Sequence, residues 1–117
     1  MKAFAIDIEE ATKRNTNYRE VIYTDENIQI VLMGLIEGED IPKEVHGGTQ
    51  FIRVESGRGL AIVGGKKYKL EDGSSITIPP HHEHYIKNNS SEMLKLYSIY
   101  SPPEHDPGTL QDHQPIN

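Results

Sequence analysis

The chain has 117 residues, which is enough for one domain with a single hydrophobic core and too few for two. Its formal net charge of −6 argues against nucleic acid and anionic membranes as partners, because both repel a negatively charged protein. The lack of cysteine excludes disulfide bonds and thiolate metal sites. No apolar run near the N-terminus resembles a signal peptide, and no stretch approaches the ~18 apolar residues of a membrane span, so we expect a cytoplasmic protein.

Hydrophobic patterning predicts an almost entirely β-structured chain, with turn signals roughly every 8–12 residues as in a sandwich or barrel. A short apolar stretch at residues 3–6 is a candidate edge strand, and a further strand is expected around residues 18–23. The following strands are expected at residues 28–36, 51–55, 60–63, 66–70, 75–78, 85–87 and 93–100. The run at 28–36 is nearly all apolar or β-prone, which predicts burial on both of its faces.

This patterning divides the chain into three parts. Residues 1–23 form an N-terminal edge segment, residues 24–103 a β-barrel, and residues 104–117 a polar tail rich in Pro, Gly, Gln and Asp. We expect the tail to pack little or to wrap the surface.

The first chemically informative stretch lies between Gly38 and Gly57. It contains Glu44, His46 and Gln50, which have the same parity, so the first two leave one face of an extended strand. The Gly47–Gly48 pair between His46 and Gln50 predicts a bulge or a tight bend. These side chains offer a carboxylate oxygen, an imidazole nitrogen and an amide oxygen.

A second stretch begins at Gly73 and continues through Pro79, His84 and Asn88. His84 would bring a second imidazole to the first three side chains from a distant segment. Oxygen and imidazole donors suit a divalent first-row metal. The sequence therefore predicts one metal site, with Glu44, His46, Gln50 and His84 as ligands, at the mouth of a small barrel.

Each proposed ligand has an alternative interpretation. His46 would be an ordinary surface histidine if it stood alone, and Glu44 could pair with a lysine at the barrel rim. Gln50 could hydrogen-bond to the other ligands instead of the metal. His81 and His82 fit a solvated turn, although His81 could lean over the site, and His105 and His113 fit structural or exposed positions in the tail. Tyr97 and Tyr100 are expected to pack in the core, with one of them pointing into the cavity.

The two stretches resemble the two motifs of the cupin superfamily. The first family motif is G, five residues, H-x-H, three or four residues, E, six residues, G; the second is G, five residues, P-x-G, two residues, H, three residues, N. Every spacing fits, and three residues differ from the pattern: Glu44 replaces the first His, Gln50 the usual Glu, and His81 the Gly. The first two changes look like an exchange of the acidic and neutral ligands, which keeps one negative charge around the metal.

The resemblance covers roughly residues 18–105 and implies an all-β fold, a double-stranded β-helix or jelly-roll cupin barrel. The stretches at 50–57 and 97–105 look like small single-domain bacterial cupins that are labelled mannose-6-phosphate isomerase-like, a label that describes their fold. Such proteins are commonly homodimers, so a homodimer is expected. Fe, Mn, Ni or Zn would suit the ligand set.

Three classes of function remain open from the sequence. One is a metal-dependent enzyme for a small polar organic molecule, of oxygenase or isomerase/lyase type. Another is a module that binds a sugar or small acid without turnover. The last is a dimer in which the metal only stiffens the barrel. The nucleophile-elbow, P-loop and Rossmann motifs do not occur in the sequence.

Overall fold

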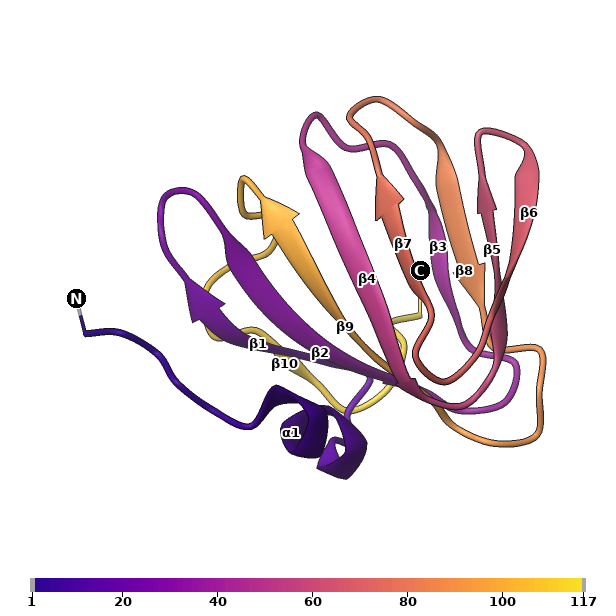
Figure 1. Ribbon diagram of the computed structural model, residues 1–117, viewed down its shortest axis with the longest axis horizontal. Helices are drawn as coiled ribbons and strands as arrows, with labels where there is room; N and C mark the ends of the chain where they lie inside the picture. Colours follow the sequence, from indigo (N-terminus) through magenta and orange to yellow (C-terminus); the bar gives the residue numbers. More distant parts are fainter. Residues whose placement is uncertain (1, 117) are drawn as a thin grey trace.

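The computed structural model describes residues 2–116, and within this range two antiparallel β-sheets face each other (Figure 1). The larger sheet has the order β10 (Leu110–Gln111), β1 (Arg19–Thr24), β2 (Gln29–Leu35), β9 (Leu94–Ser101), β4 (Thr49–Ser56) and β7 (Ser75–Ile78). The smaller sheet has the order β3 (Asp40–Glu44), β8 (His84–Lys87), β5 (Gly59–Val63) and β6 (Lys66–Leu70). The chain passes repeatedly from one sheet to the other, which confirms the predicted all-β jelly roll.

The strands expected between residues 28 and 100 are all confirmed, with shifts of one or two residues at some ends. The strand near residues 18–23 is β1. By contrast, residues 3–6 form no strand, so the prediction of an edge strand there was wrong. Two short strands, β3 and β10, were not delimited from the sequence.

Alternation along the strands builds the core between the two sheets. In β4, Gln50, Ile52 and Val54 point inward, and in β9 Leu96, Ser98 and Tyr100 do the same. The register places Gln50 opposite Tyr100 and Ile52 opposite Ser98. The apolar members of these pairs fill the barrel, while the polar members gather toward one end of it.

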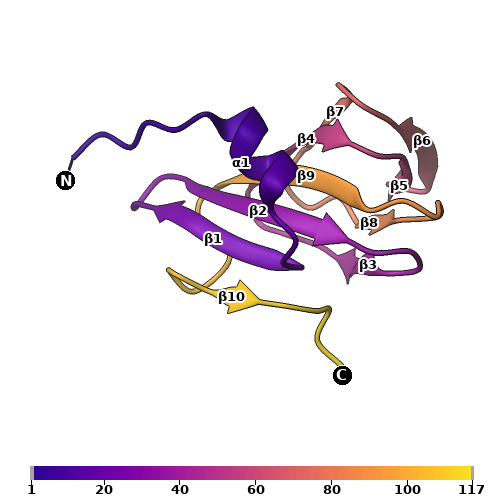
Figure 2. The ribbon, with the colours of Figure 1, turned by 90° about the horizontal axis from the view of Figure 1, so that it is seen from below.

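A short helix, α1 (Ile8–Arg14), covers the outer face of the larger sheet and packs against β2, β4 and β9 (Figure 2). Asp7 caps its first turn by accepting a hydrogen bond from the backbone N–H of Glu10 at 3.0 Å. This cover explains why β2 is buried on both faces, as predicted, with Leu32 on its outer side only 4% exposed.

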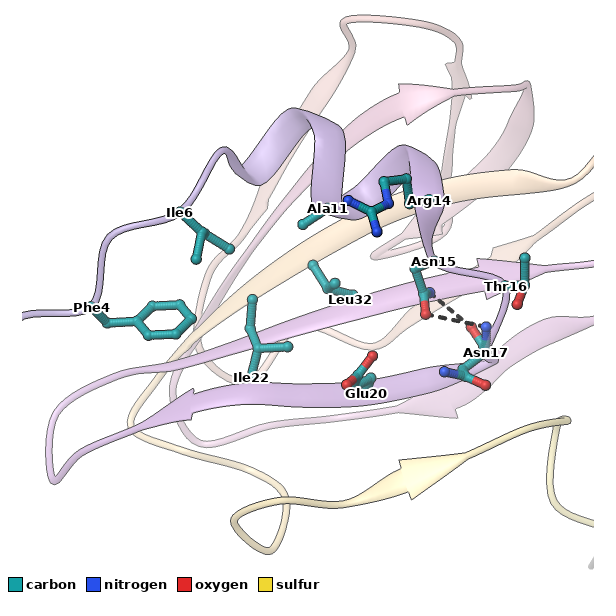
Figure 3. A pocket seen from close by; sticks show the side chains of 10 residues that line it. All are labelled: Phe4, Ile6, Ala11, Arg14, Asn15, Thr16, Asn17, Glu20, Ile22 and Leu32. Atoms are coloured by element: carbon teal, nitrogen blue, oxygen red, sulfur yellow. Dashed lines mark hydrogen bonds between the residues drawn. The ribbon is translucent and has the colours of Figure 1, made fainter.

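The extended segment before α1 runs beside the same outer face. Phe4 and Ile6 border a pocket that Ile22 and Leu32 also line (Figure 3). Phe4 is 44% exposed and Ile6 is 46% exposed. An apolar surface therefore remains open next to β1.

The two ends of the chain both contribute to the larger sheet. The expected N-terminal segment of residues 1–23 contains α1 and most of β1, and the expected tail of residues 104–117 contains β10, while their outermost residues, Met1 and Asn117, lie outside the described range. Gln114 fixes the tail to the rim of β3, where its Nε2 donates to Asp40 Oδ1 at 2.6 Å. Among residues 2–116, no helix has the length and apolar character needed to cross a membrane.

Candidate metal centre

An irregularity in β3 turns Glu44 and His46 toward the barrel interior. Ile41 pairs with Ile86 and is buried, and the register then shifts so that Glu44 pairs with His84. Without the shift, Lys43 would share the inward face with Ile41. A bulge at Pro42–Lys43 thus reverses the parity and points the metal-capable side chains inward.

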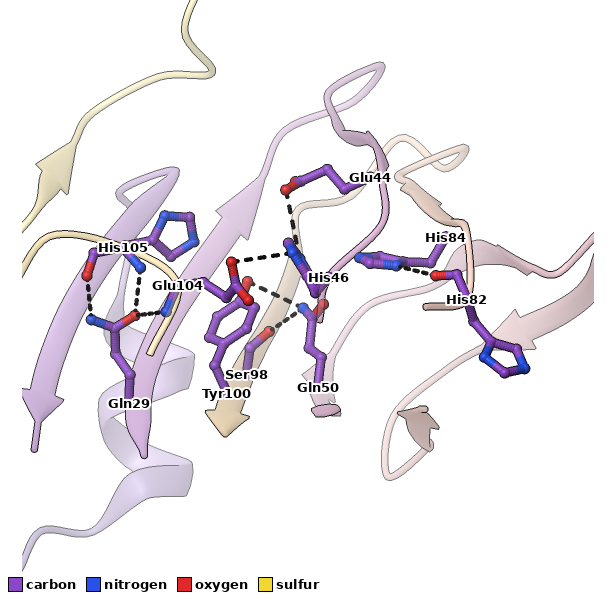
Figure 4. Close-up of polar contacts among 10 residues, drawn as sticks. All are labelled: Gln29, Glu44, His46, Gln50, His82, His84, Ser98, Tyr100, Glu104 and His105. Atoms are coloured by element: carbon purple, nitrogen blue, oxygen red, sulfur yellow. Dashed lines mark hydrogen bonds and ion pairs between the residues drawn. The ribbon is translucent and has the colours of Figure 1, made fainter. Parts of the chain in front are cut away.

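His46 lies between two carboxylates (Figure 4). Its Nε2 is 3.6 Å from Glu44 Oε2, and its Nδ1 is 3.3 Å from Glu104 Oε2. The imidazole is 10% exposed and the Glu44 side chain 35% exposed, so the pair lies at the mouth of the barrel. If Nδ1 carries the proton and donates to Glu104, the lone pair of Nε2 faces Glu44.

His84 is buried on β8, and its ring centroid is 4.8 Å from that of His46. Its Nδ1 lies 3.0 Å from the backbone carbonyl oxygen of His82, which assigns the proton to Nδ1 because the carbonyl can only accept. Its Nε2 is buried and has no hydrogen-bond partner among the described residues. This is the tautomer that a metal-ligating histidine adopts.

Gln50 on β4 approaches from the opposite sheet and is 1% exposed. Its Nε2 donates to Ser98 Oγ and to Tyr100 Oη, both at 3.2 Å (Figure 4). Its Oε1 is also buried without a partner within residues 2–116. The amide is therefore oriented with its oxygen as the free end.

The four predicted ligands come together at one end of the barrel, but their geometry is not that of a closed cage. In the part of the chain that is described, no group of three or more His, Cys, Asp or Glu side chains has the arrangement of a metal centre. Gln50 does not belong to those residue types. The separation of 3.6 Å between Glu44 and His46 is close to the roughly 3.0–3.5 Å between two donors that each lie about 2.1 Å from one ion. The distance between Glu44 and His46 is therefore compatible with two ligands of one divalent ion.

A second layer of residues around the site was not found from the sequence. Glu104 orients His46, and Gln29 in turn holds the backbone that carries Glu104. Gln29 Oε1 accepts from the N–H groups of Glu104 and His105 at 3.1 and 2.9 Å, and its Nε2 donates to the His105 carbonyl at 2.7 Å. These partners are about 75 residues apart, so no local signal could have revealed them.

Tyr100 and His105 form the wall next to the ligands. Tyr100 packs in the core, as expected for the tyrosines, with its hydroxyl beside Gln50, and burial raises its pKa far above the ordinary value, so the phenol stays protonated. His105 packs edge-on against it with ring centroids 5.3 Å apart. Burial, assisted by the charge of Arg19 and by His46, lowers the pKa of His105 to about 4, so its imidazole is neutral near pH 7.

The other histidines lie away from the ligands. His81 and His113 are exposed, as expected for solvated positions. His81 has a φ of 64°, which explains why glycine suits this position, and its backbone N–H donates to the His46 carbonyl at 2.8 Å. Its contribution to the site is therefore through the backbone.

A two-sheet jelly roll with such a polar end is the architecture of the cupin class, and comparison with known proteins agrees. Residues 31–100 match the cupin domain family, and the chain therefore belongs to that family. It is 39% identical to BH2720 of Bacillus halodurans, whose crystal structure superimposes with a TM-score of 0.93 over 96% of this chain and 90% of the other.

Two curated relatives extend the comparison. The uncharacterized protein YrkC of Bacillus subtilis is 40% identical over 95% of this chain, which spans 63% of YrkC and thus less than two thirds of its length. L-ectoine synthase of Vibrio cholerae is 39% identical over 49 residues, which are 41% of this chain and 35% of the synthase.

Proposed function

We propose that this cupin binds a divalent transition metal through Glu44, His46, Gln50 and His84 and acts on a small polar organic molecule. The observation that carries the proposal is the pair of buried atoms without partners, Gln50 Oε1 and His84 Nε2. Leaving such atoms unsatisfied costs about 1–3 kcal/mol each, and both belong to predicted ligands. A bound cation would satisfy both atoms at once.

The surrounding hydrogen bonds support the same assignment. The His82 carbonyl can accept a hydrogen bond from Nδ1–H of His84, and the Glu104 carboxylate one from Nδ1–H of His46, which leaves Nε2 of both imidazoles available. Ser98 and Tyr100 orient the Gln50 amide. Such outer partners normally orient metal ligands and tune their basicity. Fe, Mn, Ni and Zn all suit two imidazoles with oxygen donors.

Bound at these residues, the metal would supply either oxygen chemistry or Lewis-acid polarisation of a carbonyl or enediol. The protein would add a protonated Tyr100 and a neutral His105 as hydrogen-bonding groups facing the reactants. We therefore propose an enzyme of oxygenase or isomerase/lyase type. The partial match to L-ectoine synthase is consistent with an enzyme but transfers no substrate to this chain.

The alternative is a cupin that binds a sugar-like molecule, or holds a structural metal, without turnover. Its support is that no side chain within residues 2–116 stands out as a general base apart from the proposed ligands and their neighbours. The mannose-6-phosphate isomerase-like grouping and the cytoplasmic location remain predictions from the sequence. A small molecule, and neither nucleic acid nor a membrane, is the proposed partner.

The first experiment measures metal content in protein purified without chelators. A His46→Ala/His84→Ala variant should lose the metal and melt at a lower temperature than wild type in metal-replete buffer, because metal binding adds to folded-state stability. The matched control is His81→Ala/His113→Ala, which removes two exposed histidines and should keep the metal. Equal metal in wild type and the His46/His84 variant would refute the proposed site.

Turnover is then tested on the metal-loaded protein. Oxygen uptake with Fe(II) and a panel of enediols and β-diketones examines the oxygenase class, and NMR of the same mixtures under nitrogen examines isomerisation and elimination. Loss of an observed activity in the His46→Ala/His84→Ala variant would support the enzyme. Metal binding with no product from any compound would favour the binding module.

A further inference from the structure

Arg19 on β1 points into the barrel and is only 9% exposed. Its Nη1 donates to Gln111 Oε1 at 2.5 Å, and its guanidinium lies 5.2 Å from the centroid of the Tyr18 ring. Its Nε is buried without a hydrogen-bond partner, and within residues 2–116 no carboxylate lies at ion-pair distance from it. A buried charge is normally paired, because its desolvation is otherwise uncompensated. Arg19 therefore lacks the anion that a purely structural arginine would have.

The guanidinium borders a pocket of about 280 Å³ next to the proposed metal centre. Tyr18 and Pro42 provide apolar walls, and His105 and Glu44, itself a proposed metal ligand, also line the pocket. His105 Nε2 is a second buried atom with no partner in the described chain. The volume lies just below the range of about 300–1,000 Å³ for sites of drug-sized ligands, so the pocket suits a small metabolite.

We propose that this space, the Arg19 pocket, binds the carboxylate of a small organic acid and so defines the substrate class of the neighbouring metal centre. The role of the acid as a substrate rests on the proposed function, whereas its binding at Arg19 does not. A guanidinium presents a planar fork of N–H donors that matches a carboxylate. The acid would extend from Arg19, past His105, toward Glu44 and His46.

Charge favours a monoanion over phosphate. Arg19 is the only cationic side chain lining the pocket among the described residues, and Glu44 contributes a negative charge. A phosphate dianion would meet one positive and one negative group. A carboxylate matches the single guanidinium, and a metal bound at Glu44 would reduce the remaining repulsion.

The test compares lactate with its neutral isostere lactamide by ligand-observed NMR titration. Both are measured with zinc-loaded and with chelator-treated protein. Wild type should bind lactate about tenfold or more tightly than lactamide, and Arg19→Gln should weaken lactate binding by about 10-fold to 100-fold while leaving lactamide unchanged, on the scale of charged hydrogen bonds. Arg19→Lys should be intermediate. The matched control, Arg14→Gln, removes an equal charge from an exposed position on α1 and should behave as wild type.

A second readout needs no folded Arg19→Gln variant. In wild type, the ¹H–¹⁵N signal of Arg19 Nε–H, assigned by its absence in Arg19→Lys, should shift with lactate and not with lactamide. The inference is overturned if lactate does not bind, if it binds no better than lactamide, if the Arg19 signal stays fixed, or if inorganic phosphate displaces lactate at lower concentration.

The two proposals fail separately. In one outcome, lactate binding depends on Arg19 but His46→Ala/His84→Ala leaves the metal content unchanged. This result would support the carboxylate pocket and refute the metal centre. In the other outcome, that variant loses its metal but lactate binding does not depend on Arg19. This result would support the metal centre and refute the carboxylate pocket.

Discussion

Glu44 and Gln50 differ in their environment as well as in charge. Glu44 lies at the rim with a side chain that is 35% exposed, whereas Gln50 is buried and donates to two hydroxyl groups. The Glu44 carboxylate therefore lies where water can solvate it when no metal is bound. The neutral amide occupies the position where an unpaired charge would be costly.

Two single substitutions, Glu44→Gln and Gln50→Glu, test which of the two residues carries the charge that binds the metal. Glu44→Gln should weaken metal affinity about tenfold or more, since even outer partners of a metal site contribute on that scale. Gln50→Glu should bind metal at least as tightly, because Ser98 and Tyr100 can turn their hydroxyls to donate to a carboxylate. Without metal, the Gln50→Glu protein should melt below wild type, because burying a charge costs several kcal/mol.

The measurement is a metal titration by calorimetry, with thermal unfolding in the presence and absence of a chelator. The opposite ranking, in which Glu44→Gln keeps its affinity and Gln50→Glu loses it, would show that the charge-bearing ligand is assigned wrongly.

At the scale of the elements, the connection between β3 and β4 sets the position of His46 relative to Gln50. A Cβ added at Gly48 would lie 2.3 Å from the backbone oxygen of Ser101 and 2.6 Å from Pro102 Cδ. The turn therefore passes directly against the end of β9, the strand that leads to Glu104. At Gly47 a Cβ would meet no heavy atom within 4 Å.

The two glycines make a matched pair of substitutions. Gly48→Ala should lower the free energy of unfolding by about 1–3 kcal/mol, as overpacking does, and should weaken metal binding because His46 and Gln50 move. Gly47→Ala should be neutral or stabilising by up to about 1 kcal/mol, since it only restricts the unfolded chain. Urea unfolding and metal titration measure both effects. Similar losses in the two variants would show that the approach to Ser101 does not control the site.

At the scale of the whole molecule, the open apolar surface beside β1 supports the homodimer, which we retain as a proposal. β10 pairs with Arg19 and Glu20 of β1, and the Val21 N–H donates to the Thr109 carbonyl, so the C-terminal segment lies along the first half of β1. Phe4 and Ile6 lie at the open apolar surface (Figure 3). An exposed apolar patch of this kind is a ready surface for association with a second copy.

Light scattering at micromolar concentration should give twice the monomer mass of 13.2 kDa. Phe4→Asp/Ile6→Asp should shift the mass to that of the monomer without lowering metal content. The control is Ile116→Asp, which introduces a charge at a fully exposed isoleucine and should leave the dimer intact. A monomer mass for wild type would exclude the homodimer.

The sequence by itself determined the barrel and the identity of the proposed ligands. Strand periodicity and turn glycines are local properties, so they could be read without knowing the fold. Gly57 illustrates this, since its φ is 101° and a Cβ added there would lie only 2.5 Å from the Met93 carbonyl oxygen, which leaves no room for a side chain. The spacing of Glu44, His46 and Gln50 likewise reflects one short connection between adjacent strands.

Only the tertiary structure decided which groups surround those ligands. The bulge at Pro42–Lys43 makes Glu44 face inward, and it appears only when β3 is paired with β8. The bonds Gln29–His105 and Arg19–Gln111 join residues 76 and 92 positions apart. Contacts at such separations depend on strand order and register across two sheets, which no pattern within a single strand specifies. The orienting carboxylate of Glu104 and the buried charge of Arg19 therefore became visible only in the folded chain.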